Sequence, residues 1–387
     1  MIQWDEHGQI HSAKWHSENG VAPHKKIQIA DDTLTADLAY RLACEGTAML
    51  YKGDFQNARQ LLQALVRRVD KPSKKATRVD RVKKEKTKTP LDTFNLHRLA
   101  QSQRARILGM VLIPINADHS VSLRRAPDIS QACLEVYGEQ AEPYVISLRE
   151  LLGVISAHEW RKKGVPVLAR DDEEIRIHPH YGVFSPIRGE YIELVLKAPL
   201  PAALQKNSIA FDIGVGTGVL AVVLAMREIQ RIIATDQDDR AIACAKENIS
   251  RLGLNDKIEI LKTNLFPVEK AALIVCNPPW LPARPSSSLE HAVYDPESQM
   301  LKGFLSNLKD HLLPDGEGWL ILSDLAEHLG LRSREELLSW IDAAGLKVIA
   351  RLDTKPQHQK VFDKTDALYS ARSKETTSLW RLMTNIL

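Results

Sequence analysis

The chain has 387 residues, of which 44% are hydrophobic, and a formal net charge of only +3. This length is enough for two domains, and the hydrophobic content suits a globular protein. No apolar run approaches the length of a membrane span, and the opening Met-Ile-Gln-Trp-Asp-Glu is not a signal peptide. We therefore expect a cytoplasmic protein that has no contact with a membrane.

The cysteines and histidines give no sign of disulfides or of a bound metal. The four cysteines form no pairs at short spacing, which argues against a disulfide framework or a structural zinc site. His178 and His180 are close in sequence but lack further ligands, so the sequence predicts no metal site. The cysteines are Cys44, Cys133, Cys244 and Cys276.

The N-terminal half mixes helical and strand patterns. Residues 34–69 have helical spacing, and the apolar stretches 107–115 and 121–125 flank a short polar segment, which indicates a hairpin. Two more helical patterns follow, at 128–138 and 143–158. From these patterns we predict a separate α+β domain over residues 1–165 that recognises the substrate.

A strongly basic segment interrupts this half of the chain. Between Arg67 and Gly109 there are 14 lysines and arginines against four acidic residues, so this stretch carries +10 and the rest of the chain −7. Almost no large apolar residue occurs from Lys71 to Pro90, which predicts a flexible basic linker at about 70–90. Such a run favours contact with the phosphates of a nucleic acid, although a linker that only solubilises the protein has the same composition.

The C-terminal half begins with a glycine-rich turn between two apolar stretches. Residues 209–213 are typical of a short strand, a Gly-x-Gly-x-Gly sequence follows at 214–218 (the glycine-rich loop), and residues 219–226 have helical length. Glycines allow the backbone to approach a ligand closely. A second strand, 231–236, ends in Asp236, whose carboxylate can accept both hydroxyls of a ribose.

Helices and strands then alternate through the remainder of this half. A helix is expected at 239–249, and strands are expected at 257–261, 272–276, 319–323 and 346–350. Such alternation predicts a parallel sheet with ligands at the carboxyl ends of its strands. The polar stretch 354–377 is expected to be a loop, and residues 378–383 to form the last strand.

Residues 277–280 read Asn-Pro-Pro-Trp and directly follow one of these apolar strands. Each proline lacks a backbone N–H and fixes φ, so the chain must leave the sheet stiffly at this point. The Asn277 side chain offers an acceptor oxygen to an N–H group, and the Trp280 ring offers a flat face for stacking. The motif therefore predicts a clamp for a planar group that bears an NH2. A tight turn with Trp280 packed in the core is the alternative.

In this order, the glycine-rich loop, the acid at the next strand end and Asn-Pro-Pro-Trp resemble the class I S-adenosylmethionine-dependent methyltransferases. Within that class the chain is similar to the subgroup with an Asn-Pro-Pro-aromatic motif. That subgroup includes the glutamine N5-methyltransferases of the release-factor type and many enzymes that methylate exocyclic amines of RNA and DNA. The resemblance covers about residues 178–352. It implies a Rossmann-like α/β domain over residues 166–387, with a seven-stranded, mostly parallel sheet whose last strand is antiparallel.

The resemblance also implies S-adenosylmethionine as the cofactor and assigns roles to single residues. Asp236 would hold the ribose, and Asn264, where the family usually has Asp, would lie beside the adenine. Phe184 and Arg188 belong to a partial match to the Pro-Arg-Pro-Glu stretch of the glutamine-type enzymes and would contact the substrate. The other expected cofactor-binding residues are Asp212, Gly214, Gly216, Thr217 and Gly218. The expected catalytic residues are Asn277, Pro278, Pro279 and Trp280.

The chemistry of the motif leaves two acceptors open. Acceptor oxygens of Asn277 and Pro278 would localise the lone pair of an amine nitrogen and so favour its attack on the cofactor's methyl group. The basic segment favours N6 of an adenine in ribosomal or transfer RNA, which would have to be flipped out of a duplex. The context Tyr294-Asp295-Pro296-Glu297 instead favours a glutamine of a translation-apparatus protein. A third possibility is a methyltransferase-like protein that binds RNA without catalysis.

Overall fold

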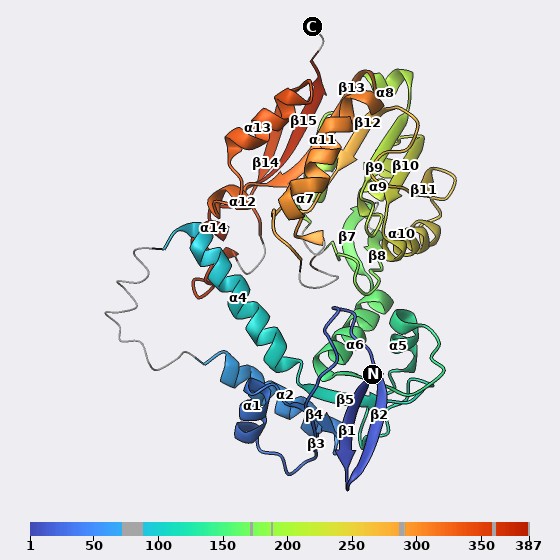
Figure 1. Cartoon of the computed structure of the whole chain (residues 1–387). Helices are drawn as coiled ribbons and strands as arrows, with labels where there is room; N and C mark the ends of the chain where they lie inside the picture. The colour runs from blue at the N-terminus through green and yellow to red at the C-terminus, as the bar shows by residue number, and fades with distance from the viewer. Residues whose placement is uncertain are drawn as a thin grey trace. The chain divides into compact units, whose positions relative to one another are not determined.

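The computed structural model describes residues 1–71, 88–170, 173–186, 189–285, 290, 292–357 and 361–385 (Figure 1). The chain divides into two compact units. The N-terminal unit comprises Met1–Thr89 and Asn95–Glu159, and the C-terminal unit comprises Pro90–Phe94 and Trp160–Leu387. Within the described ranges, no helix is both long and apolar enough to cross a membrane. Most of the predicted basic linker, residues 72–87, lies outside the described residues.

The N-terminal unit is built on a six-stranded sheet with the order β1-β2-β6-β5-β4-β3. The sheet is mixed, because β4 runs parallel to both β3 and β5, whereas β5 and β6 are antiparallel. Every residue of β4 is buried, as expected for a strand covered on both faces. The strands are β1 (Ile2–Glu6), β2 (Gln9–Trp15), β3 (Ile27–Ala30), β4 (Ala48–Tyr51), β5 (Val111–Ile115) and β6 (Tyr144–Ser147). The helices, two of which extend into the C-terminal unit, are α1 (Ala36–Cys44), α2 (Phe55–Val69), α4 (Pro90–Leu108), α5 (Ser130–Tyr137) and α6 (Leu148–Lys163).

Three expectations for this half of the chain are wrong. The helix expected at 143–158 begins only at Leu148, because Tyr144–Ser147 form β6. Residues 34–69 are not helical throughout, because β4 separates α1 from α2 and pairs with β3 and β5. The expected hairpin of 107–115 with 121–125 does not form either, since β5 pairs with β4 and β6. Residues 121–125 instead lie at the start of α2, where Arg125 Nε donates to the Asp54 carboxylate at 2.7 Å. An ion pair at a helix start thus replaces the strand pairing that the apolar pattern suggested.

The C-terminal unit confirms the predicted α/β fold. Its seven-stranded sheet has the order β11-β10-β9-β12-β13-β15-β14. The strands from β11 to β13 are parallel, and β15 is antiparallel to both of its neighbours, as the resemblance implied. The strands are β9 (Ile209–Ile213), β10 (Arg231–Asp236), β11 (Ile258–Lys262), β12 (Ala271–Cys276), β13 (Leu312–Ser323), β14 (Leu346–Thr354) and β15 (Thr377–Thr384). A separate antiparallel ribbon is formed by β7 (Val165–Arg170) and β8 (Glu173–Ile177).

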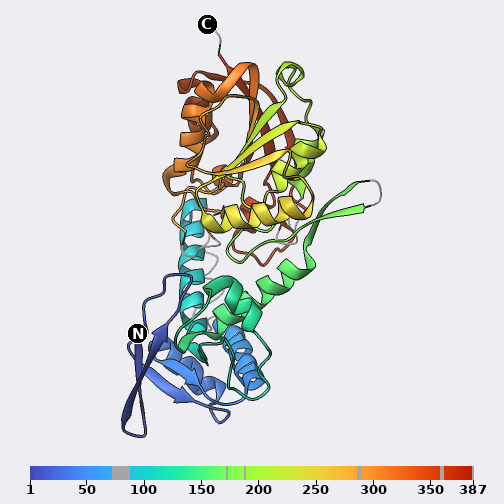
Figure 2. The same ribbon diagram turned by 90° about the vertical axis from the view of Figure 1, so that its right-hand side faces the viewer.

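Helices cover both faces of this sheet (Figure 2). Successive strand residues point to opposite faces, so Ala210 packs with α7, α9 and α10, whereas Phe211 packs with α11 and α13. Trp280 contacts both of these cores, which places it at the rim of the sheet. The helices are α7 (Glu190–Lys197), α8 (Ala203–Lys206), α9 (Val219–Met226), α10 (Asp239–Arg251), α11 (Gln299–His311), α12 (Leu325–His328), α13 (Arg334–Ala343) and α14 (Tyr369–Arg372), the last of which lies in the expected loop 354–377.

A buried ion pair joins the inserted strand β15 to β13. The Arg381 guanidinium donates two hydrogen bonds to the Glu317 carboxylate, at 2.8 and 2.7 Å. The Trp319 indole donates a third to the same carboxylate at 2.9 Å. A buried carboxylate that lost its partner would be strongly destabilising. The pair therefore helps to fix the register of β15 between β13 and β14.

Candidate functional site

The glycine-rich loop connects β9 to α9 at the carboxyl edge of the sheet. Gly214, Gly216 and Gly218 have φ values of +79°, +52° and +87°, in the left-handed region that favours glycine. The Gly214 N–H donates to the Thr235 carbonyl at 2.9 Å, which ties the loop to β10. The Gly216 N–H donates to the Asp236 carboxylate at 3.1 Å. The structure thus brings the acid at the end of β10 into direct contact with the loop.

Asp212, on β9, is a buried carboxyl group beside this loop. It is only 1% exposed. Its Oδ2 accepts the Ala221 N–H at 2.9 Å, whereas its Oδ1 has no hydrogen-bond partner among the described residues. Burial, together with the neighbouring Asp236 carboxylate, raises the pKa of Asp212 to about 7. A buried carboxylate oxygen without a partner suits a cationic group, such as an ammonium.

The start of α11 packs against the same loop. A Cβ atom placed on Gly214 would lie 2.7 Å from the terminal methyl carbon of Met300. The Asp295 carboxylate accepts the Met300 N–H at 3.0 Å and so caps the helix. Just before it, Glu297 and Ser298 have φ values of +57° and +55°, a strained pair for residues other than glycine. Met300 was not predicted as a site residue, because a lone methionine carries no sequence signal.

The Asn-Pro-Pro-Trp motif leaves the sheet beside the glycine-rich loop. β12 is parallel to β9, and Cys276, at the end of β12, is paired with Ile213, at the end of β9. The residues that follow, Asn277 and Gly214, therefore leave neighbouring strands at the same level. Parallel strands end at one edge of a sheet, which is where open α/β folds bind their ligands.

Asn277 and Trp280 are hydrogen-bonded to each other. The Trp280 indole N–H donates to the Asn277 side-chain oxygen at 2.9 Å. Both side chains are half-buried, and Pro278 between them is buried. The bond fixes the direction of the carboxamide and uses one lone pair of its oxygen, which leaves the other free to accept from a ligand. The sequence suggested two independent contacts to a substrate, whereas the structure makes them one unit.

The other expected site residues are more dispersed. Asn264 follows β11 at the same edge of the sheet, and its side chain is exposed. Phe184 is 36% exposed and lies in the segment 178–186, which follows β8. Arg188 lies outside the described residues. One contact that the sequence did not indicate is made by Asn248, a buried residue of α10 that bonds to the glycine-rich loop.

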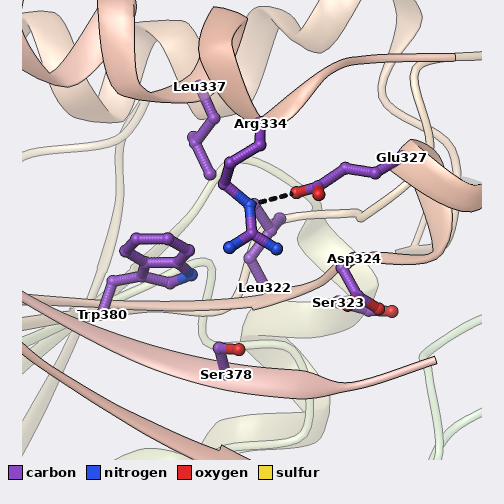
Figure 3. A pocket seen from close by; sticks show the side chains of 8 residues that line it. All are labelled: Leu322, Ser323, Asp324, Glu327, Arg334, Leu337, Ser378 and Trp380. Carbon is purple, nitrogen blue, oxygen red and sulfur yellow. Dashed lines mark hydrogen bonds and ion pairs between the residues drawn. The ribbon is translucent and has the colours of Figure 1, made fainter. Parts of the chain in front are cut away.

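A small hollow elsewhere in the C-terminal unit is filled by its own side chains (Figure 3). There Arg334 Nε donates to Glu327 Oε1 at 2.7 Å, and its guanidinium lies 5.2 Å from the centre of the Trp380 ring. The hollow is lined by Leu322, Ser323, Asp324, Glu327, Arg334, Leu337, Ser378 and Trp380, so it is separate from the site above. In the part of the chain that the structure describes, no group of three or more His, Cys, Asp or Glu could hold a metal ion.

Part of the chain is similar in sequence to known proteins. Residues 174–333 match the family model of the methyltransferase small domain. The release factor glutamine methyltransferase of Cereibacter sphaeroides is 30% identical over 195 residues, which cover 47% of this chain and 63% of that protein. The tRNA1(Val) (adenine(37)-N6)-methyltransferase of Bacteroides thetaiotaomicron is 33% identical over 119 residues, or 28% of this chain and 50% of that protein. The crystal structure of ribosomal protein L11 methylase from Lactobacillus delbrueckii subsp. bulgaricus is 17% identical, with a TM-score of 0.38, over 58% of this chain and 93% of that chain.

The matched stretches span between half and two thirds of the length of the two curated relatives. The family match includes the glycine-rich loop and the Asn-Pro-Pro-Trp motif, both of which lie within residues 174–333. Residues 174–333 thus match the methyltransferase small domain, and the α/β fold of the C-terminal unit is the one that the resemblance implied. The cofactor of the class I methyltransferases is S-adenosylmethionine, and the unpartnered Asp212 oxygen beside the glycine-rich loop fits its ammonium group.

Proposed function

We propose that the protein transfers a methyl group from S-adenosylmethionine to a planar exocyclic NH2 nitrogen, and that this nitrogen is N6 of an adenine in RNA. One observation carries the reaction type. The Asn277 carboxamide leaves the sheet next to Gly214, and the Trp280 indole fixes its orientation. An acceptor oxygen beside the cofactor loop suits a substrate that presents N–H groups. We place this activity in the cytoplasm.

Three carboxylate or amide side chains would hold the cofactor. Asp212 Oδ1 would accept its ammonium, Asp236 would accept the ribose hydroxyls, and Asn264 would bond to the adenine. The cofactor supplies a methyl group that its positive sulfonium makes electrophilic. The glycines of the loop would let the backbone approach it closely, since no side chain stands in the way.

Asn277 and Trp280 would orient the acceptor nitrogen. The free lone pair of the Asn277 oxygen would accept one N–H of the amine, and the Pro278 carbonyl would accept the other. Two acceptors on one nitrogen favour the form whose lone pair is localised and can attack the methyl carbon. The Trp280 ring would stack on the planar group and set its height. The proton that the methylated nitrogen loses would pass to water, because a cationic amine of this kind is acidic.

The charge of the chain supports RNA as the acceptor. Residues 67–109 carry +10, which suits the phosphates of a nucleic acid. One of the relatives is named as an adenine-N6 methyltransferase of a tRNA. A second candidate acceptor is a glutamine side chain in a protein of the translation apparatus. The relative that matches over 195 residues is named as a release factor glutamine methyltransferase.

Label transfer separates these acceptors. The purified chain would be incubated with S-adenosylmethionine that carries a radioactive methyl group and with extract of cells that lack the protein. We expect ribonuclease, and not protease, to remove the label from the macromolecular fraction. Label that only protease removes would assign the activity to a protein acceptor. Absence of label, together with absence of cofactor binding in calorimetry, would indicate an RNA-binding protein without catalysis.

We predict that the affinity for S-adenosylhomocysteine weakens at acidic pH. The pKa of Asp212 is about 7 in the free protein, so its carboxyl group loses its charge below that pH. A ligand ammonium binds the ionised form, and the affinity should therefore fall about tenfold from pH 8 to pH 6 as that form becomes scarce. Isothermal titration calorimetry measures this change. The Asp212→Asn variant is the control, and its affinity should not vary over this range. A wild-type affinity that stays constant from pH 8 to pH 6 would contradict the assignment.

We predict that Gly214→Ala loses cofactor binding in addition to stability. An alanine there would have an unfavourable φ of +79°, and the flexible end of the Met300 side chain, 2.7 Å from the added Cβ, would have to shift. Gly253, with φ +66°, is a matched control, because a Cβ on it meets no described atom within 4 Å. Both substitutions should cost about 1–2 kcal/mol of unfolding free energy for the left-handed backbone. Calorimetry should show weaker binding of S-adenosylhomocysteine for Gly214→Ala alone. Equal affinities of the two variants would show that the loop does not require glycine at this position.

A further inference from the structure

The segment 178–186 is attached to α10 by several side chains, of which Asn248 makes two hydrogen bonds to His178. Asn248 Oδ1 accepts the His178 N–H at 2.7 Å, and Asn248 Nδ2 donates back to the His178 carbonyl at 3.2 Å. Beside this pair, the His180 N–H donates to the Cys244 sulfur at 3.4 Å, and the His180 ring lies 2.8 Å from a Glu247 carboxylate oxygen. Specific hydrogen bonds thus attach the start of the segment to α10.

The same side chain reaches the glycine-rich loop. Asn248 Nδ2 also donates to the Thr217 carbonyl at 3.1 Å. Asn248 is 1% exposed, so water cannot replace these partners at low cost. The two protons of a carboxamide nitrogen serve two carbonyls here, one from each segment. A movement of either segment must break or bend its hydrogen bond to Asn248.

We infer that Asn248 is a positioning residue that couples occupancy of the glycine-rich loop to the order of the segment 178–186. The inference rests on the proposed function only in taking the loop as the binding site of the cofactor. Ligand binding restrains Thr217, the carboxamide passes this restraint to the His178 carbonyl that it also bonds, and the segment that carries Phe184 becomes less mobile. Cofactor binding would thereby precede and prepare binding of the methyl acceptor.

Hydrogen exchange in the full-length chain tests this coupling. The His178 and His180 N–H groups report on the segment, because both are bonded to α10. In the wild type, S-adenosylhomocysteine should slow exchange both in the glycine-rich loop and in peptides that cover 178–186. Asn248→Asp keeps an acceptor for the His178 N–H but lacks the N–H donors. This variant should bind S-adenosylhomocysteine about tenfold more weakly, a factor that is usual for coupling between two sites. In this variant, the bound ligand should slow exchange in the glycine-rich loop but not in 178–186. Lys246→Ala, at an exposed position of the same helix, should behave as wild type.

The outcomes are distinguishable. If the wild type does not bind S-adenosylhomocysteine, the proposed function fails. If the wild type binds the ligand but exchange in 178–186 does not change, the coupling is refuted. This measurement uses only the wild-type protein, so it decides the question even if Asn248→Asp does not fold. Asn248→Asp could instead be less stable to heat and still show slower exchange in 178–186 when the ligand binds. That result would mean that Asn248 has only a structural role, and it would also refute the coupling. The same loss of response in Lys246→Ala would attribute the effect to α10 in general and not to Asn248.

Discussion

Replacing Asn277 by alanine is expected to lower kcat about 10²- to 10³-fold, because the lost group would act on the acceptor nitrogen in the transition state. The affinity for S-adenosylhomocysteine should stay within about twofold of the wild-type value. The carboxamide is held in place before any substrate arrives, by the Trp280 indole at 2.9 Å. Such a prearranged acceptor needs no reorganisation during the reaction, which is why its loss should be felt in kcat. Single-turnover label transfer at saturating cofactor measures the effect, and calorimetry measures the affinity.

The matched control is Asn255→Ala, since Asn255 is an exposed asparagine in the turn after α10. Its kcat should equal that of the wild type. A second variant, Asn277→Asp, keeps the shape of the side chain and the acceptor oxygens but adds a charge. It should retain more activity than Asn277→Ala if acceptance of an N–H is what the position provides. Wild-type turnover in Asn277→Ala would refute the proposed clamp.

The substitutions Trp280→Phe and Trp280→Ala are expected to separate the two roles of this side chain. Phenylalanine keeps a ring that can stack but cannot donate to the Asn277 oxygen. The loss of one hydrogen bond should lower kcat up to about tenfold. Alanine removes the ring as well, and stacking on a base is worth about 1–3 kcal/mol, so kcat should fall by about another tenfold or more. Steady-state kinetics over a range of acceptor concentrations measures both effects.

Stability measurements complete the comparison at Trp280. The ring packs against the cores on both faces of the sheet, so alanine should also lower the melting temperature, whereas phenylalanine should lower it only slightly. Trp340→Phe, in α13, controls for the change of ring type at a half-buried position away from the site. If Trp280→Phe were as inactive as Trp280→Ala, the hydrogen bond and not the stacking would be the main contribution. Full activity of both would remove Trp280 from the proposed mechanism.

The cofactor half of the fold was predictable because its signals are local. The strand before the glycine-rich loop, the loop itself and the helix after it follow one another within 209–226, so neighbouring residues are enough to reveal them. The seven-stranded, mostly parallel sheet and its antiparallel last strand came from the family resemblance and were confirmed. The adjacency of Asn277 and Gly214 follows from the same topology, since it depends only on β9 and β12 being parallel neighbours.

The N-terminal sheet was not predictable from local patterns. Its strands β4 and β6 are four residues long, and a buried strand of that length has the same apolar run as part of a buried helix. β6 leads directly into α6, so the two were interpreted as one helix from residue 143. Their pairing depends on contacts between distant parts of the chain. Side-chain hydrogen bonds such as those of Asn248 are invisible for the same reason.

The position of β15 has a consequence for how the protein is made. β13 and β14 are synthesised first, but each lies beside β15 and not beside the other. Until Thr377–Thr384 has left the ribosome, both strands expose unpaired N–H and C=O groups, and the Glu317 carboxylate lacks Arg381. Exposed edges of this kind pair readily with other chains. Nascent chains that end before Thr377 should therefore depend on chaperones and aggregate without them, because β13 and β14 lack their shared neighbour β15 until that point.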